Sequence, residues 1–168
     1  MDAGRVGLTY AQGEELRHEV RERVALDWRT PGLRLEAIAY AARRTAESWP
    51  MPPRVVDWDW QRIIKRKAPT DVDLAVWHGD VLCGLAYGQG KPGWLELGWV
   101  EGNPHGHPLS GQVMDLALAV LRTQAFALDI PETRLKNPFE ELREAYRRRG
   151  WRDLVEVDGA VYLCRRRP

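Results

Sequence analysis

The 168-residue sequence predicts a single α/β (α+β) domain, with a mixed, mostly antiparallel central sheet flanked by about four helices. Three observations indicate this fold class. Helix-like stretches dominate the start of the chain, three strand-like runs follow one another closely in its middle, and a helix, strand, helix and hairpin close it. We therefore expect one domain over residues 1–168, with a helical region in 1–67 and a sheet-containing core in 68–168.

The first elements along the chain are expected to be a short strand and then helices. The strand is predicted at Val6–Tyr10. Leu16, Val20 and Val24 form one apolar stripe of a helix over 14–27. A second helix is predicted over 33–48, because apolar residues recur there at helical spacing before Pro50 ends the pattern. Residues 58–67 indicate a short helix that leads into a loop.

The middle and end of the chain alternate between strand and helix patterns. Strands are predicted over 73–77 and 81–87, joined by the turn His78-Gly79-Asp80, and over 94–100. The remaining elements are a helix from Gly111 or Gln112 to about Leu128, a strand at 133–136, a helix at 139–149, and strands at 154–157 and 160–164 around Asp158-Gly159.

Composition argues against several classes of protein. With a net charge of +1, no global field would draw the chain to nucleic acid or a membrane. Local basic runs are more typical of solvated edges than of polyanion sites: Lys65-Arg66-Lys67, Arg147-Arg148-Arg149 and Arg165-Arg166-Arg167. We expect no secretory leader, because the first residues include charges and lack an apolar segment, and no apolar run approaches the roughly 20 residues of a membrane span. We expect a cytoplasmic protein in which Cys83 and Cys164 are buried free thiols.

The loop after the third strand of the middle region has two interpretations. The stretch VEGNPHGHPLSGQVMDLAL runs from strand through a Gly- and Pro-rich loop into a helix. The free amides and positive dipole end of a helix N-terminus bind phosphate readily. The alternative is a sharp corner, in which Pro108 and Ser110 only start the helix and Ser110 is its N-cap.

The order of elements, this loop and a second segment near the end of the chain together resemble the GCN5-related N-acetyltransferase (GNAT) superfamily. Members have a loop of the pattern Arg/Gln-Gly-x-Gly-x-Gly/Ala, which binds the pyrophosphate of acetyl-CoA. An ungapped alignment places the sequence from His105 to Ser110 on it, so that Gly106 matches and Ser110 is small enough. Pro108 stands where a glycine amide is expected and has no N–H to donate, so the loop is degenerate. His105 or His107 could supply another donor.

The second segment is LKNPFEELREAYRRRGW, which is similar to the strand, Asn, Tyr-ending helix and Gly-aromatic of that superfamily. Asn137, Tyr146, Gly150 and Trp151 fill these positions. The resemblance implies that Tyr146 protonates the departing CoA thiolate. A half-buried tyrosine that packs beside Phe139 and Leu142 fits the same pattern.

The resemblance further implies acetyl-CoA as co-substrate, held by Trp99, Val100, His105, Gly106, Leu109, Ser110, Gly111, Gln112, Val113 and Asn137. A backbone amide near Trp99 or Val100 would polarise the thioester carbonyl. Glu96 is the preferred general base; Glu101 and His105 are the other candidates. Strand alternation predicts Glu96, Gly98 and Val100 on one face and Glu101 on the other. Glu96 paired with an arginine, or on a solvated face, is an equally good interpretation.

The acceptor side of this superfamily corresponds to residues 1–67 and would include Trp28, Asp57, Trp58 and Trp60. Carboxylates beside aromatic rings suit a cationic amine, whereas the simpler interpretation of any one tryptophan is core packing. The predicted function is acetyl transfer from acetyl-CoA to an amine, a small molecule or macromolecule, by direct attack in a ternary complex. The alternatives are a non-catalytic GNAT-fold binding protein with a decayed loop and a protein that modifies or binds nucleic acid. A homodimer is compatible with the sequence, and we expect no metal, because His105-x-His107 lacks a second cluster of ligands.

Overall fold

The computed structural model describes residues 7–168 and contains one seven-stranded sheet. The strands lie in the order β1-β2-β3-β4-β5-β7-β6. Every pair of neighbours is antiparallel except β4 and β5, which are parallel. The predicted mixed, mostly antiparallel sheet is thereby confirmed. The strands are β1 (Leu33–Glu36), β2 (Val72–His78), β3 (Val81–Lys91), β4 (Trp94–Gly102), β5 (Glu132–Lys136), β6 (Asp153–Val157) and β7 (Ala160–Arg166).

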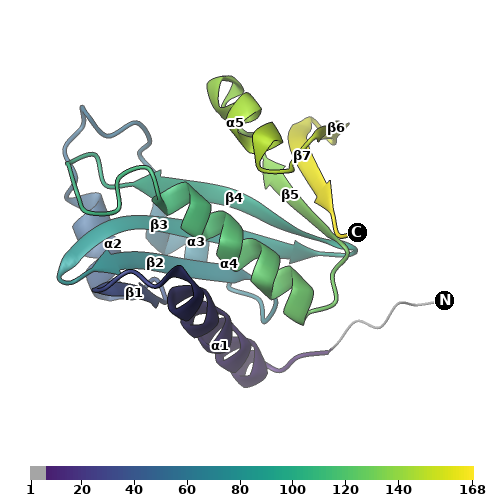
Figure 1. Ribbon diagram of the computed structural model, residues 1–168, viewed down its shortest axis with the longest axis horizontal. Coiled ribbons are helices and arrows are strands. Elements are labelled where there is room, and N and C mark those ends of the chain that lie inside the picture. The colour runs from purple at the N-terminus through teal and green to yellow at the C-terminus, as the bar shows by residue number, and fades with distance from the viewer. Residues whose placement is uncertain (1–6) are drawn as a thin grey trace.

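Helices cover both faces of the sheet (Figure 1). On one face, α1 and α4 enclose a core cluster with Leu95 and Leu97 of β4. On the other face, α2 and α3 pack over Leu85 and Tyr87 of β3. The helices are α1 (Tyr10–Trp28), α2 (Tyr40–Glu47), α3 (Trp60–Ile64), α4 (Val113–Ala127) and α5 (Arg143–Arg148), with one 3₁₀ turn at Glu140–Leu142.

The N-terminal elements differ from the sequence prediction in two places. Of the predicted strand at Val6–Tyr10, Val6 lies outside the described residues and Tyr10 already begins α1. Residues 7–9 form no strand, and Thr9 is the N-cap of α1, where its side chain and that of Gln12 form a capping box. The predicted helix over 33–48 was wrong in its first half, which forms β1 and pairs with β2.

The chain between β1 and α2 is held in place by a side chain that lies far away in the sequence. The Ile38 amide donates to Oδ1 of Asp73 at 2.7 Å, and this hydrogen bond separates β1 from the helix that starts at Tyr40. The apolar spacing of residues 33–48 is compatible with both arrangements, because an exposed edge strand of only four residues leaves a short alternating pattern.

A β-bulge in β4 sets which side chains share a face. Gly88 of β3 is opposite Leu97 and Tyr87 is opposite Trp99, so Gly98 is an extra residue in β4. The insertion reverses the alternation beyond Gly98. Leu97 and Val100 consequently pack on the α1–α4 face, whereas Trp99 packs on the α2–α3 face.

The predicted separation of Glu96 from Glu101 was therefore wrong. Leu95 and Leu97, the neighbours of Glu96 in β4, pack on the α1–α4 face, so Glu96 points to the opposite face. Glu101 points to that same face, because it accepts a hydrogen bond from Trp60 of α3. Both carboxylates lie on the α2–α3 face of β4, and Val100 lies on the face opposite Glu96. Regular alternation would have placed residues five apart on opposite sides, and the one-residue bulge cancels that difference.

The remaining elements confirm the prediction with small changes of boundary. The hairpin of β2 and β3 turns at Gly79-Asp80, and that of β6 and β7 turns at Asp158-Gly159. The predicted helix over 139–149 is divided into the 3₁₀ turn and α5. The helix predicted before Leu128 is α4, and β5 extends the strand predicted at 133–136 by one residue.

Candidate active site

A cavity of about 480 Å³ lies where β4 and β5 stop pairing. The last pair between these parallel strands is Leu97 with Leu135. Beyond it β4 continues to Gly102, while β5 leads away toward α5 (Figure 1). Residues on both sides of this gap line the cavity, namely Leu97, Gly98, Trp99 and Val100 of β4 and Leu135 to Pro138 after and within β5. The gap is therefore an opening in the sheet rather than a hollow above it.

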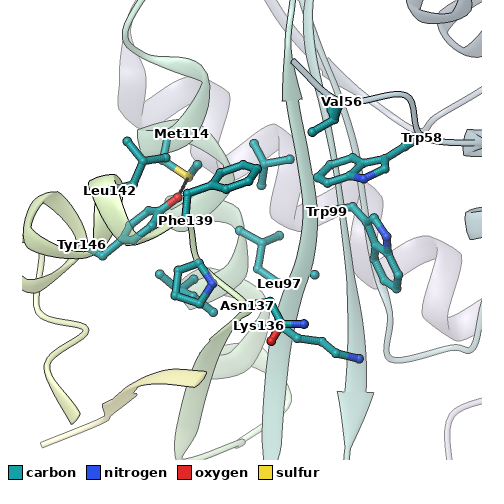
Figure 2. A pocket seen from close by; sticks show the side chains of 14 residues that line it. Val56, Trp58, Leu97, Trp99, Met114, Lys136, Asn137, Phe139, Leu142 and Tyr146 are labelled. Carbon is teal, nitrogen blue, oxygen red and sulfur yellow. Dashed lines mark hydrogen bonds between the residues drawn. The ribbon is translucent and has the colours of Figure 1, made fainter. Parts of the chain in front are cut away.

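The cavity has two different sides (Figure 2). Phe139, Leu142 and Tyr146 stand with Met114 of α4 on one side. Trp58 and Trp99 stand on the other, beside Val56. The common face predicted for Phe139, Leu142 and Tyr146 is confirmed, because all three point to the same cavity.

Tyr146 lies on α5 with only 7% of its surface exposed. Its hydroxyl donates a weak hydrogen bond to the Met114 sulfur at 3.6 Å. Burial raises the pKa of Tyr146 above its ordinary value, and the nearby Arg149 offsets part of that rise. The phenol is therefore protonated at neutral pH, which is the state that a proton donor needs.

Glu96 is completely buried in β4. Its Oε2 accepts a hydrogen bond from the Trp94 indole at 3.0 Å, whereas Oε1 has no hydrogen-bond partner among the described residues. Lys136 of β5 is the nearest cation, with 3.8 Å between Nζ and Oε1. The alternative of an arginine partner does not apply within residues 7–168. A buried carboxylate oxygen without a donor is costly and is typical of a functional site.

Glu101 is also buried but is fully engaged. Both of its oxygens accept hydrogen bonds from the Arg54 guanidinium, and Oε2 accepts a further one from the Trp60 indole at 2.6 Å. Hydrogen bonding to Glu101 raises the pKa of Arg54. These contacts fix the loop before α3 onto β4, and they leave Glu101 poorly placed to accept a proton from a substrate.

The loop before α4 satisfies some of its own amides. The Leu109 amide donates to the His107 ring at 3.2 Å, and those of Ser110 and Gln112 donate to backbone carbonyls of the loop. The amides of Gly111, Val113 and Met114 make no hydrogen bond to a described residue. Because they open α4, they form a small donor group at the positive end of its dipole.

The other residues of this loop differ in their contacts and exposure. The corner interpretation is wrong in one detail, because Gln112 rather than Ser110 is the N-cap of α4 and makes no capping bond through its side chain. Ser110 instead bonds the His107 carbonyl through its hydroxyl at 3.0 Å. His105 and Gly106 are exposed, and burial lowers the pKa of His107.

The four residues predicted on the acceptor side have separate locations. Trp58 lines the cavity, and Asp57 is exposed beside it at 3.3 Å from Arg54. Trp60 has no exposed surface, so its ring has no face open to an acceptor, and its indole N–H donates a hydrogen bond to Glu101. Trp28 lies on the α1–α4 face, where its indole donates to Gln112 at 3.0 Å. It supports the loop rather than the cavity.

Lys136 and Asn137, which directly follow Leu135, also line the cavity. Asn137 adopts a positive φ of 46°, and its side chain accepts a hydrogen bond from the Val161 amide at 2.9 Å, which fixes the end of β5 to β7. Lys136 was not identified from the sequence. The sequence does show that Lys136 follows an apolar residue at the end of a predicted strand. It does not show that Lys136 lies close to Glu96, because Glu96 belongs to another strand, β4.

Two negative findings concern residues 7–168 alone. No group of three or more His, Cys, Asp or Glu side chains in this part of the chain could hold a metal ion. No helix within it is long and apolar enough to cross a membrane.

Comparison with known proteins finds similarity in structure but not in sequence. No family model and no curated protein matches the sequence. Among solved structures, N-acetylglutamate synthase from Neisseria gonorrhoeae, complexed with coenzyme A and L-arginine, has a TM-score of 0.61 at 13% identity, over 82% of this chain and 34% of that one.

Two smaller proteins are matched over most of their length. Ribosomal-protein-S18-alanine N-acetyltransferase from Escherichia coli has a TM-score of 0.54 at 11% identity, over 80% of this chain and 93% of that one. PaiA N-acetyltransferase from Thermoplasma acidophilum, in complex with coenzyme A, has a TM-score of 0.51 at 12% identity, over 80% and 99%. The identities are low, so the likeness concerns the fold. The chain has the fold of the GCN5-related N-acetyltransferase superfamily.

Proposed function

We propose that the protein transfers an acetyl group from acetyl-CoA to an amine acceptor by direct attack in a ternary complex. The observation that carries this proposal is the cavity in the gap between β4 and β5, which has a protonated phenol on one side. The lining residue Lys136 connects the cavity to Glu96, a buried carboxylate with a free oxygen that lies 3.8 Å from the Lys136 ammonium and outside the lining itself. An acid for the leaving group and a base for the nucleophile are the two groups that aminolysis of a thioester requires.

The reaction assigns a role to each group. The acceptor nitrogen attacks the thioester carbon, so that a C–N bond forms and the C–S bond breaks. Glu96 takes the proton that the nitrogen loses, and Tyr146 gives its proton to the departing thiolate. The amide of Trp99 or Val100 would stabilise the carbonyl oxygen. Beyond Leu97 the edge of β4 that faces β5 has no strand partner within residues 7–168, while the other edge remains paired with β3.

The co-substrate is assigned to the α4 side of the gap. Its pyrophosphate would accept hydrogen bonds from the amides of Gly111, Val113 and Met114, with His105 or His107 as an additional donor. Gly106, Leu109, Ser110 and Gln112 shape this loop, and Asn137 lies at the other edge of the cavity. Two of the similar structures contain coenzyme A, which supports a coenzyme A thioester as the co-substrate.

The acceptor is assigned to the opposite side of the gap. Trp58 lines the cavity there, and Asp57 could attract a cationic group at the mouth. Trp60 and Trp28 would act only indirectly, by holding Glu101 and Gln112.

The two alternative functions make different predictions. A non-catalytic protein with a decayed loop would bind a partner without turnover. Nucleic-acid binding is disfavoured because several members of the C-terminal basic runs already pair with carboxylates: Arg149 with Asp115, Arg166 with Glu132 and Arg167 with Asp129. Salt dependence of any polyanion binding would test it, since phosphate contacts weaken steeply with added salt.

The experiment is a calorimetric titration of acetyl-CoA into the wild type and into the Tyr146→Phe and Pro108→Gly variants. We expect micromolar binding to the wild type, and binding without turnover in Tyr146→Phe. Pro108→Gly adds one amide to the loop and should tighten binding by about fivefold, the value of one hydrogen bond. Binding only in Pro108→Gly would favour the decayed-loop alternative, and no binding to any of the three would contradict the proposed function.

A further inference from the structure

Lys136 is the one charged side chain among the described residues that line the cavity. About 32% of its side chain is exposed, and it extends from β5 past Asn137 on the side of the cavity where Trp99 lies (Figure 2). Apart from Asn137, the rest of the lining on that side is aromatic or aliphatic. A single ammonium in a mainly apolar cavity suggests a role in binding a ligand, because a lysine that only aids solubility would lie on the open surface.

The ion pair of Lys136 with Glu96 is loose. The two atoms are 3.8 Å apart and form no hydrogen bond, although Glu96 Oε1 has no other partner and the ammonium has three donors. The pair therefore retains one free acceptor on its carboxylate and free donors on its ammonium. Lys136 is the member that solvent reaches, since the Glu96 side chain is only 1% exposed.

This arrangement is complementary to a zwitterion. A carboxylate of the acceptor fits the free donors of Lys136, which lines the cavity. An ammonium on the same molecule would then lie close to the negative charge of Glu96, which is buried behind the cavity lining, 3.8 Å from Lys136. An amine without a carboxylate would bring a second positive charge close to the Lys136 ammonium, and the single carboxylate of Glu96 would be the one negative charge shared by both. A neutral amide in place of the carboxylate would lose a charge-assisted hydrogen bond.

We propose that Lys136 binds the carboxylate of the acceptor, and that the acceptor is an α-amino acid with an apolar or aromatic side chain. The inference rests on the proposed function and names its substrate class. Val56, Trp58 and Trp99 form the apolar wall beside Lys136, and this wall accounts for the side chain. The α-amine, two bonds from the carboxylate carbon, then lies between Glu96 and the thioester.

The test compares three probes that differ only at the carboxylate: L-phenylalanine, L-phenylalaninamide and phenethylamine. Acetylation by the wild type should be about 10- to 100-fold more efficient, as kcat/KM, for the amino acid than for the other two, which is the value of one charged hydrogen bond. Lys136→Met should remove this preference mainly through KM, and Lys136→Arg should restore most of it. The exposed Lys65→Met variant is the control and should retain the preference.

Binding provides a second readout that does not require turnover. Quenching of tryptophan fluorescence by L-phenylalanine, with CoA present, should saturate in the wild type and weaken at least tenfold in Lys136→Met. Lys136-dependent binding without turnover would contradict acetyl transfer but uphold the carboxylate site. Equal use of the amino acid and its amide by the wild type, or equal binding of L-phenylalanine by the wild type and Lys136→Met, would overturn the inference.

Discussion

Glu96 and Glu101 lie on the same face of β4, both are buried, and they differ in almost every contact. Glu101 has a guanidinium on both oxygens and an indole on one of them. Glu96 has an indole on one oxygen, a distant ammonium, and no hydrogen bond to the other oxygen. The first arrangement stabilises a loop, whereas the second leaves capacity for a substrate. Two glutamates in one strand thus have different roles, because side chains from other elements bind both oxygens of Glu101 and only one oxygen of Glu96.

Removal of the Arg54 side chain is expected to have the largest effect on stability. Arg54→Met leaves Glu101 buried without its counter-ion, which costs about 3–5 kcal/mol of unfolding free energy. Urea denaturation followed by circular dichroism would measure this. A loss below about 1 kcal/mol would show that Glu101 is not held as tightly as its contacts indicate.

Glu96→Gln should affect turnover and not stability. We expect kcat/KM for acetyl transfer to fall by about 100-fold, because the amide cannot accept the proton. Unfolding free energy should change by less than about 1 kcal/mol, since Oε1 makes no hydrogen bond to lose. Glu101→Gln is the matched control and should lower stability while largely retaining kcat. The reverse pattern, with Glu101→Gln the inactive variant, would exchange the two roles.

The phenol of Tyr146 should set the alkaline limit of the reaction. Burial raises the pKa of Tyr146, so the phenol keeps its proton at pH values where an unburied tyrosine loses it, and loses it only as pH rises through the raised pKa. The kcat profile should therefore stay level through the pH range in which an unburied tyrosine titrates and decline only above that range. Tyr146→Phe should lower kcat and remove this decline. A decline that persists in the variant would belong to another group.

Asp57→Asn is expected to have the smallest effect. The Asp57 side chain is 79% exposed and 3.3 Å from Arg54, so the loss of this contact should change unfolding free energy by less than about 0.5 kcal/mol. Thermal unfolding checks this. A larger loss would mean that Asp57, and not Glu101 alone, holds Arg54 in place.

Local patterns were sufficient for most of the sheet and for one side of the site. The turns at Gly79-Asp80 and Asp158-Gly159 lie between short runs of strand-forming residues, so the hairpins are visible in the sequence. The helical spacing of Phe139, Leu142 and Tyr146 likewise predicts the shared face that forms one wall of the cavity.

What the sequence did not reveal depends on long-range pairing. Gly98 looks like any glycine in a strand, and only its register with Tyr87 and Gly88 shows the bulge that brings Glu101 to the face of Glu96. Arg54 meets Glu101 across 47 positions of sequence. Trp58 and Trp60 are the same residue type on either side of Asp59, so the sequence does not distinguish them. Tertiary packing buries Trp60 completely and places Trp58 in the lining of the cavity.

The most direct test of the account is release of free CoA thiol when the wild type and Glu96→Gln are mixed with acetyl-CoA and a set of primary amines. The account predicts many turnovers by the wild type that depend on the amine, and acetyl-CoA binding with about 100-fold slower release by Glu96→Gln. Binding of acetyl-CoA without amine-dependent thiol release by the wild type, or equal release by both proteins, would contradict it.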